Sequence, residues 1–170
     1  MTVDINSPVY GIKDAIKQLN SIEPGLRNQI TVDYRRIAKP VIQDAKAMIP
    51  QQVPISGMAR KWNPRSGYDL LPWEVTHKQI LKAQINTKNI REFGGRKSNV
   101  GTFVIRWSGP NAVLFDTSTN GRLGSALTAK YGSASRVLWP AYQKNRSTVV
   151  IEMVKLVETV MDKVNRNVVQ

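Results

Sequence analysis

The 170-residue sequence predicts an α+β fold, in which a small antiparallel sheet packs against a kinked N-terminal helix and a long C-terminal helix, with long loops between them. Two observations carry this prediction. Apolar residues recur at helical spacing near both ends of the chain, whereas β-branched and aromatic residues concentrate in its middle. The length suits a single domain, residues 1–170, with one hydrophobic core.

The N-terminal region, residues 8–48, is predicted to be helical. A serine followed by a proline opens a short helix over residues 8–22. A longer helix follows from about Pro24 to Met48, because its apolar residues step by three or four and form one stripe. Pro40 lies inside this stripe and predicts a kink, since proline removes one backbone hydrogen bond.

The middle of the chain is predicted to contain a loop and then the sheet. Residues 50–76 carry four prolines and two glycines, which favour a long loop or arm. The sheet is expected over residues 78–118, with β-rich runs at residues 78–87, 100–109 and 111–118. A basic, glycine-rich segment is typical of a hairpin tip between the first two, and Ser-Gly-Pro-Asn predicts a tight turn between the last two.

The last third of the chain is predicted to be a loop followed by a helix. Residues 117–136 are rich in Gly, Ser and Thr and are expected to form a second long loop. A helix is expected over residues 140–165. Its apolar stripe consists of Val150, Met153, Val157, Val160 and Val164, widened by Val149, Leu156 and Met161. An apolar face of this width must be buried.

The charge is strongly positive, with 25 basic and 12 acidic residues and a formal net charge of +13. The excess is concentrated in residues 49–148, which hold 15 bases and four acids, while the flanks are nearly balanced. This asymmetry indicates contact with a polyanion or an acidic protein surface, although a solubilising surface is the simpler alternative.

Targeting signals are not evident in the sequence. The N-terminal residues lack the basic and apolar regions of a secretory signal, and no window approaches the roughly 18 apolar residues of a membrane span. We expect a soluble protein or a component of a soluble assembly, with no membrane partner.

Candidate catalytic groups are few. The chain has no cysteine and one histidine, His77, so a zinc site or a Cys–His pair within one chain is excluded. Magnesium chemistry needs clustered carboxylates, and the central acids are separated by unrelated elements. Asp116 is the best single candidate, but a capping or salt-bridge role explains it better. We therefore expect no enzymatic activity, no metal site and no cofactor.

Binding residues are better represented, because basic and aromatic side chains interleave on the predicted loops. Such groups suit phosphate contact with stacking, and equally a protein interface. The candidates for phosphate or DNA-channel contact are Arg60, Lys61, Arg65, Arg91, Arg96, Lys97, Arg122 and Lys130. The candidates for a subunit interface are Trp62, Tyr68, Trp73 and Trp139. No base-reading motif accompanies them.

Both ends of the chain also carry a family pattern. The long N-terminal helix ends in "AKPVIQDAKAMIP" (38–50), and "VLWPAYQKNRSTVVIEMV" (137–154) opens the last helix. Leu138-Trp139-Pro140-Ala141 and Asn145-Arg146 stand where a Phe-Leu-x-Pro-Ala motif and an Asn-Arg pair are usual. In these features the chain resembles the tail-completion, or head–tail joining, proteins in the neck of long-tailed bacteriophages (siphophages). It departs from them at "VLFDTSTNG", where Glu-x-Gly-Thr is usual.

The resemblance implies a non-enzymatic virion protein, made in the host cytoplasm, that forms a ring of six identical subunits where the tail meets the head connector. Its implied partners are other copies of itself, other phage neck and tail proteins, and the genome DNA that passes through the channel. A tail terminator or a head-side adaptor would also form a neck ring.

Two alternatives from other classes remain open on the sequence. One is a stand-alone, sequence-nonspecific nucleic-acid-binding protein, which would bind as a free subunit with a steep salt dependence. The other is a magnesium-dependent nuclease that needs Asp116 or Glu92.

Overall fold

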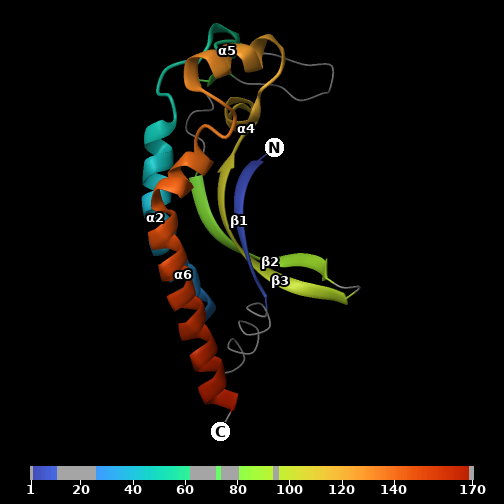
Figure 1. Cartoon of the computed structure of the whole chain (residues 1–170), viewed down its shortest axis with the longest axis vertical. Coiled ribbons are helices and arrows are strands. Elements are labelled where there is room, and N and C mark those ends of the chain that lie inside the picture. Colours follow the sequence, from blue (N-terminus) through green and yellow to red (C-terminus); the bar gives the residue numbers. More distant parts are fainter. Residues whose placement is uncertain (1, 11–25, 62–71, 74–80, 94–95, 169–170) are drawn as a thin grey trace. The chain divides into compact units, whose positions relative to one another are not determined.

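The computed structural model describes residues 2–10, 26–61, 72–73, 81–93 and 96–168. Its elements, shown in Figure 1, are β1 (Thr2–Tyr10), α2 (Leu26–Met48), the 3-10 turn η1 (Ser56–Met58), β2 (Leu81–Phe93), β3 (Arg96–Ser108), α4 (Pro110–Thr117), α5 (Gly121–Tyr131) and α6 (Leu138–Val168). The fold is α+β with a long C-terminal helix, as the sequence predicts.

The sheet has three strands in the order β1-β3-β2. Only residues 94–95 separate β2 from β3, so these two strands form an antiparallel hairpin. This confirms the hairpin that the sequence predicts here, although both strands continue through most of the segment that was expected to be its tip. Strand β1 was not predicted. It includes residues 8–10 of the expected first helix, whose remainder lies outside the described residues.

Helix α4 replaces the third predicted strand. Its short apolar run, "NAVLFDT", fits a buried strand or a buried helix equally well by periodicity. The residues before this run favour the helix. Gly109 has a positive φ of 126° that turns the chain after β3, and Pro110 then occupies the first turn of the helix. The Ser-Gly-Pro-Asn segment therefore breaks the chain direction as predicted, but it starts a helix instead of closing a hairpin.

Helix α5 occupies residues that were predicted to be a loop. The small residues have a packing role here, since a Cβ at Gly124 would lie 2.4 Å from the carbonyl carbon of Thr119. Gly132 has a positive φ of 84° and follows the last helical residue, as helix C-caps often do. The loop prediction was wrong because it counted these glycines as breaks in the helical pattern.

The chain divides into two compact units that interleave along the sequence. Unit 1 comprises residues 1–5, 41–82 and 106–144, and unit 2 comprises residues 6–40, 83–105 and 145–170. The boundary within α2 falls directly after Pro40, and the helix is continuous through this residue. The kink itself stays a prediction.

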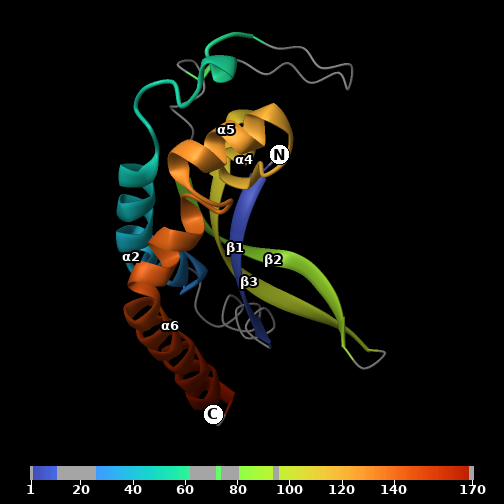
Figure 2. The ribbon, with the colours of Figure 1, turned by 45° about the horizontal axis from the view of Figure 1, so that its top comes forward.

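Unit 1 is built around a buried aromatic cluster. The ring centroid of Phe115 lies 5.5 Å from that of Trp73, 6.3 Å from that of Trp107 and 5.1 Å from that of Tyr131. Tilted and edge-on rings at these separations pack favourably. The cluster therefore brings α4 and α5 together with β3 and the segment around Trp73, and Figure 2 shows α4 and α5 side by side.

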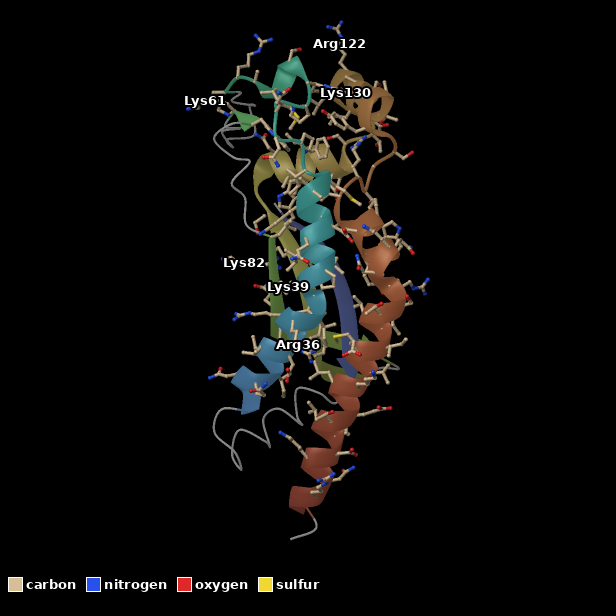
Figure 3. All side chains as sticks on the ribbon, turned by 90° about the vertical axis from the view of Figure 1, so that its left-hand side faces the viewer. Arg36, Lys39, Lys61, Lys82, Arg122 and Lys130 are labelled. Carbon is tan, nitrogen blue, oxygen red and sulfur yellow. The ribbon has the colours of Figure 1, made fainter. Side chains whose placement is uncertain are left out.

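Unit 2 contains helical segments packed on the sheet. The ring of Tyr34 on α2 lies 4.7 Å from that of Phe103 on β3, and burial raises the pKa of the Tyr34 phenol. On α6, Val149, Met153, Leu156 and Val160 are buried at spacings of four, three and four residues. In this unit α2 and α6 lie side by side on one face of the sheet, which agrees with the predicted layering (Figures 1 and 3).

Candidate nucleic-acid interface

The segment that follows α2 is held against α5 by hydrogen bonds to one backbone carbonyl. Lys130 donates from Nζ to the Pro54 oxygen at 2.9 Å, and the Tyr131 hydroxyl donates to the same oxygen at 3.4 Å. A Cβ at Gly57 would lie 3.8 Å from the Leu123 side chain, so η1 also approaches α5 closely. Residues 50–61 and α5 therefore form one surface of unit 1.

This surface gathers four of the predicted phosphate-contact residues. Arg60 and Lys61 follow η1, while Arg122 and Lys130 belong to α5, and all four residues are exposed. Figure 3 shows Lys61, Arg122 and Lys130 at the same end of unit 1. We call these four residues the basic end. Lys130 is partly engaged by Pro54, and its ammonium also lies 5.3 Å from the centre of the Tyr131 ring.

The chain segments that carry the basic end contain few acids. Residues 45–68 and 117–151 contain no aspartate or glutamate. The carboxylates of unit 1 whose side chains the structure describes are Asp44, which bonds to Lys144 at 2.9 Å, and Asp116, which is 1% exposed. The chain segments that form the basic end therefore carry a local excess of positive charge.

Asp116 and Arg136 form an internal polar network behind this surface. Arg136 is 8% exposed and donates to the carbonyl oxygens of Phe115, Ser118 and Gly132 and to the Thr128 hydroxyl. Its guanidinium thus ties the end of α4 to the end of α5. Arg136 is the last residue of the segment that was predicted to be a loop, and its buried side chain has a structural role.

The Asp116 carboxylate caps the last helix. Its Oδ1 accepts the Val137 N–H at 2.7 Å, directly before α6 begins. Burial raises the pKa of Asp116, opposed by the Val137 and Arg136 backbone hydrogen bonds and by the Arg136 charge. Burial also lowers the pKa of Arg136, and the Asp116 charge opposes that shift. This geometry supports the capping role that the sequence favours for Asp116.

Trp73 and Trp139, two of the predicted subunit-interface residues, differ in burial. Trp73 is 1% exposed and donates from Nε1 to the Pro50 oxygen at 3.0 Å, so it belongs to the core of unit 1. Its burial corrects the prediction of a subunit-interface role, because no side-chain surface is left for a neighbour. Trp139 is 49% exposed and stacks at 5.6 Å on Tyr142, and its interface role stays a prediction.

Several predicted residues cannot be placed by their side chains. Trp62, Arg65, Tyr68 and His77 lie outside the described residues. Arg91, Arg96 and Lys97 belong to β2 and β3, but the structure describes only their backbone, as it does for Glu92. Their proposed contacts with phosphate, and the alternative of a nuclease site at Glu92, stay predictions.

Sequence reasoning missed a second exposed surface, which lies in unit 2. The α6 side chains Val150, Ile151, Val154 and Met161 are 42–55% exposed. Val150 and Met161 belong to the stripe that the sequence predicted to be buried, so that prediction was wrong for these two residues. On α2, Val32 is 54% exposed next to the exposed residues Arg35, Arg36 and Lys39. The sequence contains this second set of apolar residues on α6. Sequence reasoning combined part of it with the buried set into one wide stripe.

The described residues contain no group of three or more His, Cys, Asp or Glu side chains placed to hold a metal ion. Among the described helices, none combines the length and hydropathy needed to span a bilayer.

Comparison with known proteins does not identify a relative. No protein-family model matches the sequence. Searches of curated proteins and of solved structures return no significant match.

Proposed function

We propose that the chain is a structural protein of the neck of a long-tailed bacteriophage, where copies of it form a ring that joins the tail to the head connector and surrounds the DNA channel. The basic end carries this proposal. Four exposed cations on one surface suit the phosphate backbone of duplex DNA. Such contacts position DNA without reading its sequence.

The position of the family-like motif supports the same proposal. The resemblance gives Leu138-Trp139-Pro140-Ala141 the role of opening the last helix, and α6 begins at Leu138. Trp139 is exposed at this point and is available to a neighbouring ring or subunit. In a ring, each copy meets the next through two different patches.

A stand-alone nucleic-acid-binding protein is the second candidate, and the basic end favours it as well. The two functions differ in whether the assembled ring or the free subunit binds DNA tightly. A neck ring concentrates one basic end per subunit around the duplex, so the assembled form binds far more tightly than the free subunit. A stand-alone protein binds tightly as a monomer.

Neutralising the basic end tests the DNA contact. The triple variant Arg60→Gln, Lys61→Gln, Arg122→Gln leaves the bond from Lys130 to Pro54 intact. We expect it to lower the slope of log affinity against log salt by about 2 to 3 per subunit in contact with DNA, as fluorescence anisotropy with duplex DNA would measure on the assembled protein. The matched control, Arg146→Gln, Lys155→Gln, Arg166→Gln, removes the same charge from α6 and should leave the slope nearly unchanged.

The opposite result, an unchanged slope in the basic-end variant and a reduced slope in the control, would contradict the channel assignment. Tight binding by the monomer, equal to that of the assembled form, would instead favour the stand-alone protein.

A further inference from the structure

Helix α6 carries two apolar stripes in unit 2, and the chain buries only one of them. The buried stripe is Val149, Met153, Leu156 and Val160. The second stripe is Val150, Val154, Val157 and Met161, one residue further along at each step and with the same spacing of four, three and four. At 3.6 residues per turn, these positions form a seam of the kind that packs against another helix. We call it the outer stripe.

The outer stripe is exposed to an unusual degree. Val150 is 45%, Val154 50% and Met161 42% exposed, and Ile151 beside them is 55% exposed, while Val157 is half-buried. Contiguous apolar side chains on a protein surface mark interaction sites. A stable interface buries about 800 Å² on each partner, more than these side chains supply alone. The partner must therefore also contact the polar residues that flank the stripe.

Acids outnumber bases along the outer stripe itself, in a chain that is strongly basic overall. Residues 150–162 contain three acids and one base. The base, Lys155, bonds to Glu152 at 3.0 Å. Glu158 and Asp162 are exposed and form no ion pair with a described residue. The partner of the outer stripe is thus expected to carry positive charge around a small apolar centre.

The outer face of α2 has this chemistry. Residues 28–39 contain three bases and one acid. Val32 is 54% exposed, and Arg35, Arg36 and Lys39 lie three, four and seven residues after it, on the same side of the helix. Figure 3 shows Arg36 and Lys39 along α2. The aliphatic stems of arginine and lysine cover apolar surface while their charged ends reach nearby carboxylates.

We propose that the outer stripe of α6 in one copy docks on the outer face of α2 in the next copy. Val32 and the stems of Arg35 and Lys39 cover the valines of the stripe, and their cations meet Glu158 and Asp162. Both faces belong to unit 2, and they are different patches of one chain. Contacts between different patches are the kind that closes a ring, so the inference rests on the proposed ring and names the contact that builds it.

Disulfide trapping tests the contact directly, because the chain contains no cysteine of its own. Val32→Cys and Val154→Cys are made as separate single variants, one with a tag that changes its mass. Mixing them under mild oxidation should give a mixed disulfide-linked dimer on a non-reducing gel, while each variant alone gives little. A dimer of Val154→Cys alone would show that α6 packs on α6 of another copy, and would overturn the proposal.

Charge reversal provides the second measurement. Glu158→Lys with Asp162→Lys, and separately Arg35→Glu with Lys39→Glu, should each weaken self-association at least tenfold in sedimentation experiments, because like charges then meet across the interface. The quadruple variant should recover most of the association. Circular dichroism checks that each variant keeps its helices.

The outcomes separate this contact from the ring itself. Closed rings in native mass spectrometry that are insensitive to all these substitutions would overturn the α2–α6 contact and leave the proposed function standing. A wild-type chain that stays monomeric at all concentrations and within particles would contradict the ring, and the contact with it.

Discussion

Replacing Arg136 with alanine should destabilise unit 1 by about 3–5 kcal/mol, because several hydrogen bonds to a charged donor and the favourable charge near the buried Asp116 are lost together. The Arg136 guanidinium donates hydrogen bonds to three backbone carbonyls and one hydroxyl, and its positive charge interacts with the buried carboxylate of Asp116. With alanine, the three carbonyl oxygens and the hydroxyl lose the Arg136 donor. The buried Asp116 carboxylate also loses the positive charge near it. Urea or guanidinium unfolding followed by fluorescence measures the loss.

Two further substitutions identify the cause of that loss. Arg136→Lys keeps the charge but loses the planar fork that reaches several carbonyls at once, so an intermediate loss is expected. Arg122→Ala removes an exposed arginine from the same region and should change the free energy of unfolding by about 0.5 kcal/mol or less. Equal effects of Arg136→Ala and Arg122→Ala would contradict the assigned network.

Replacing Phe115 with alanine should cost a similar amount, about 3–5 kcal/mol, because it empties the centre of the aromatic cluster. Phe115 is 1% exposed and its ring contacts three other rings, from Trp73, Trp107 and Tyr131. The cavity therefore lies between four elements that cannot all move in to fill it. Thermal or denaturant unfolding measures the effect, and tryptophan fluorescence should change because two indoles lose their neighbour.

Leu114 supplies the matched control for Phe115. It lies next to Phe115 on α4 but is only partly buried, so Leu114→Ala should cost clearly less. Phe115→Leu should fall between the two, since it keeps much of the volume. A Phe115→Ala protein as stable as wild type would mean that unit 1 does not depend on this cluster.

The long helices could be predicted from the sequence because their apolar residues repeat over many turns. Helix α2 was expected to Met48 and ends there, and α6 runs from Leu138, two residues before its expected start. The short elements could not be predicted in this way. Helix α4 has eight residues, too few for a period to show, and Gly124 in α5 reflects close packing on Thr119.

The candidate surfaces could also be predicted only in part, because a sequence shows charge but not burial. Charge is visible in a sequence, so the excess of bases in the segments that hold Arg60, Lys61, Arg122 and Lys130 could be found without a structure. Burial is not visible for an isolated aromatic residue. Trp73 was assigned to an interface because its surroundings look like a loop, yet it lies 1% exposed against Phe115. How the apolar face of α6 divides into a buried and an outer stripe depends on tertiary packing alone.

The location of the protein in phage particles tests the central proposal most directly. Purified tailed particles would be labelled with gold-conjugated antibodies against this chain and imaged by electron microscopy. The account predicts label at the junction of head and tail, in particles whose tails are attached. Absence of the chain from intact particles, or label confined to the capsid surface or the distal tip of the tail, would contradict it.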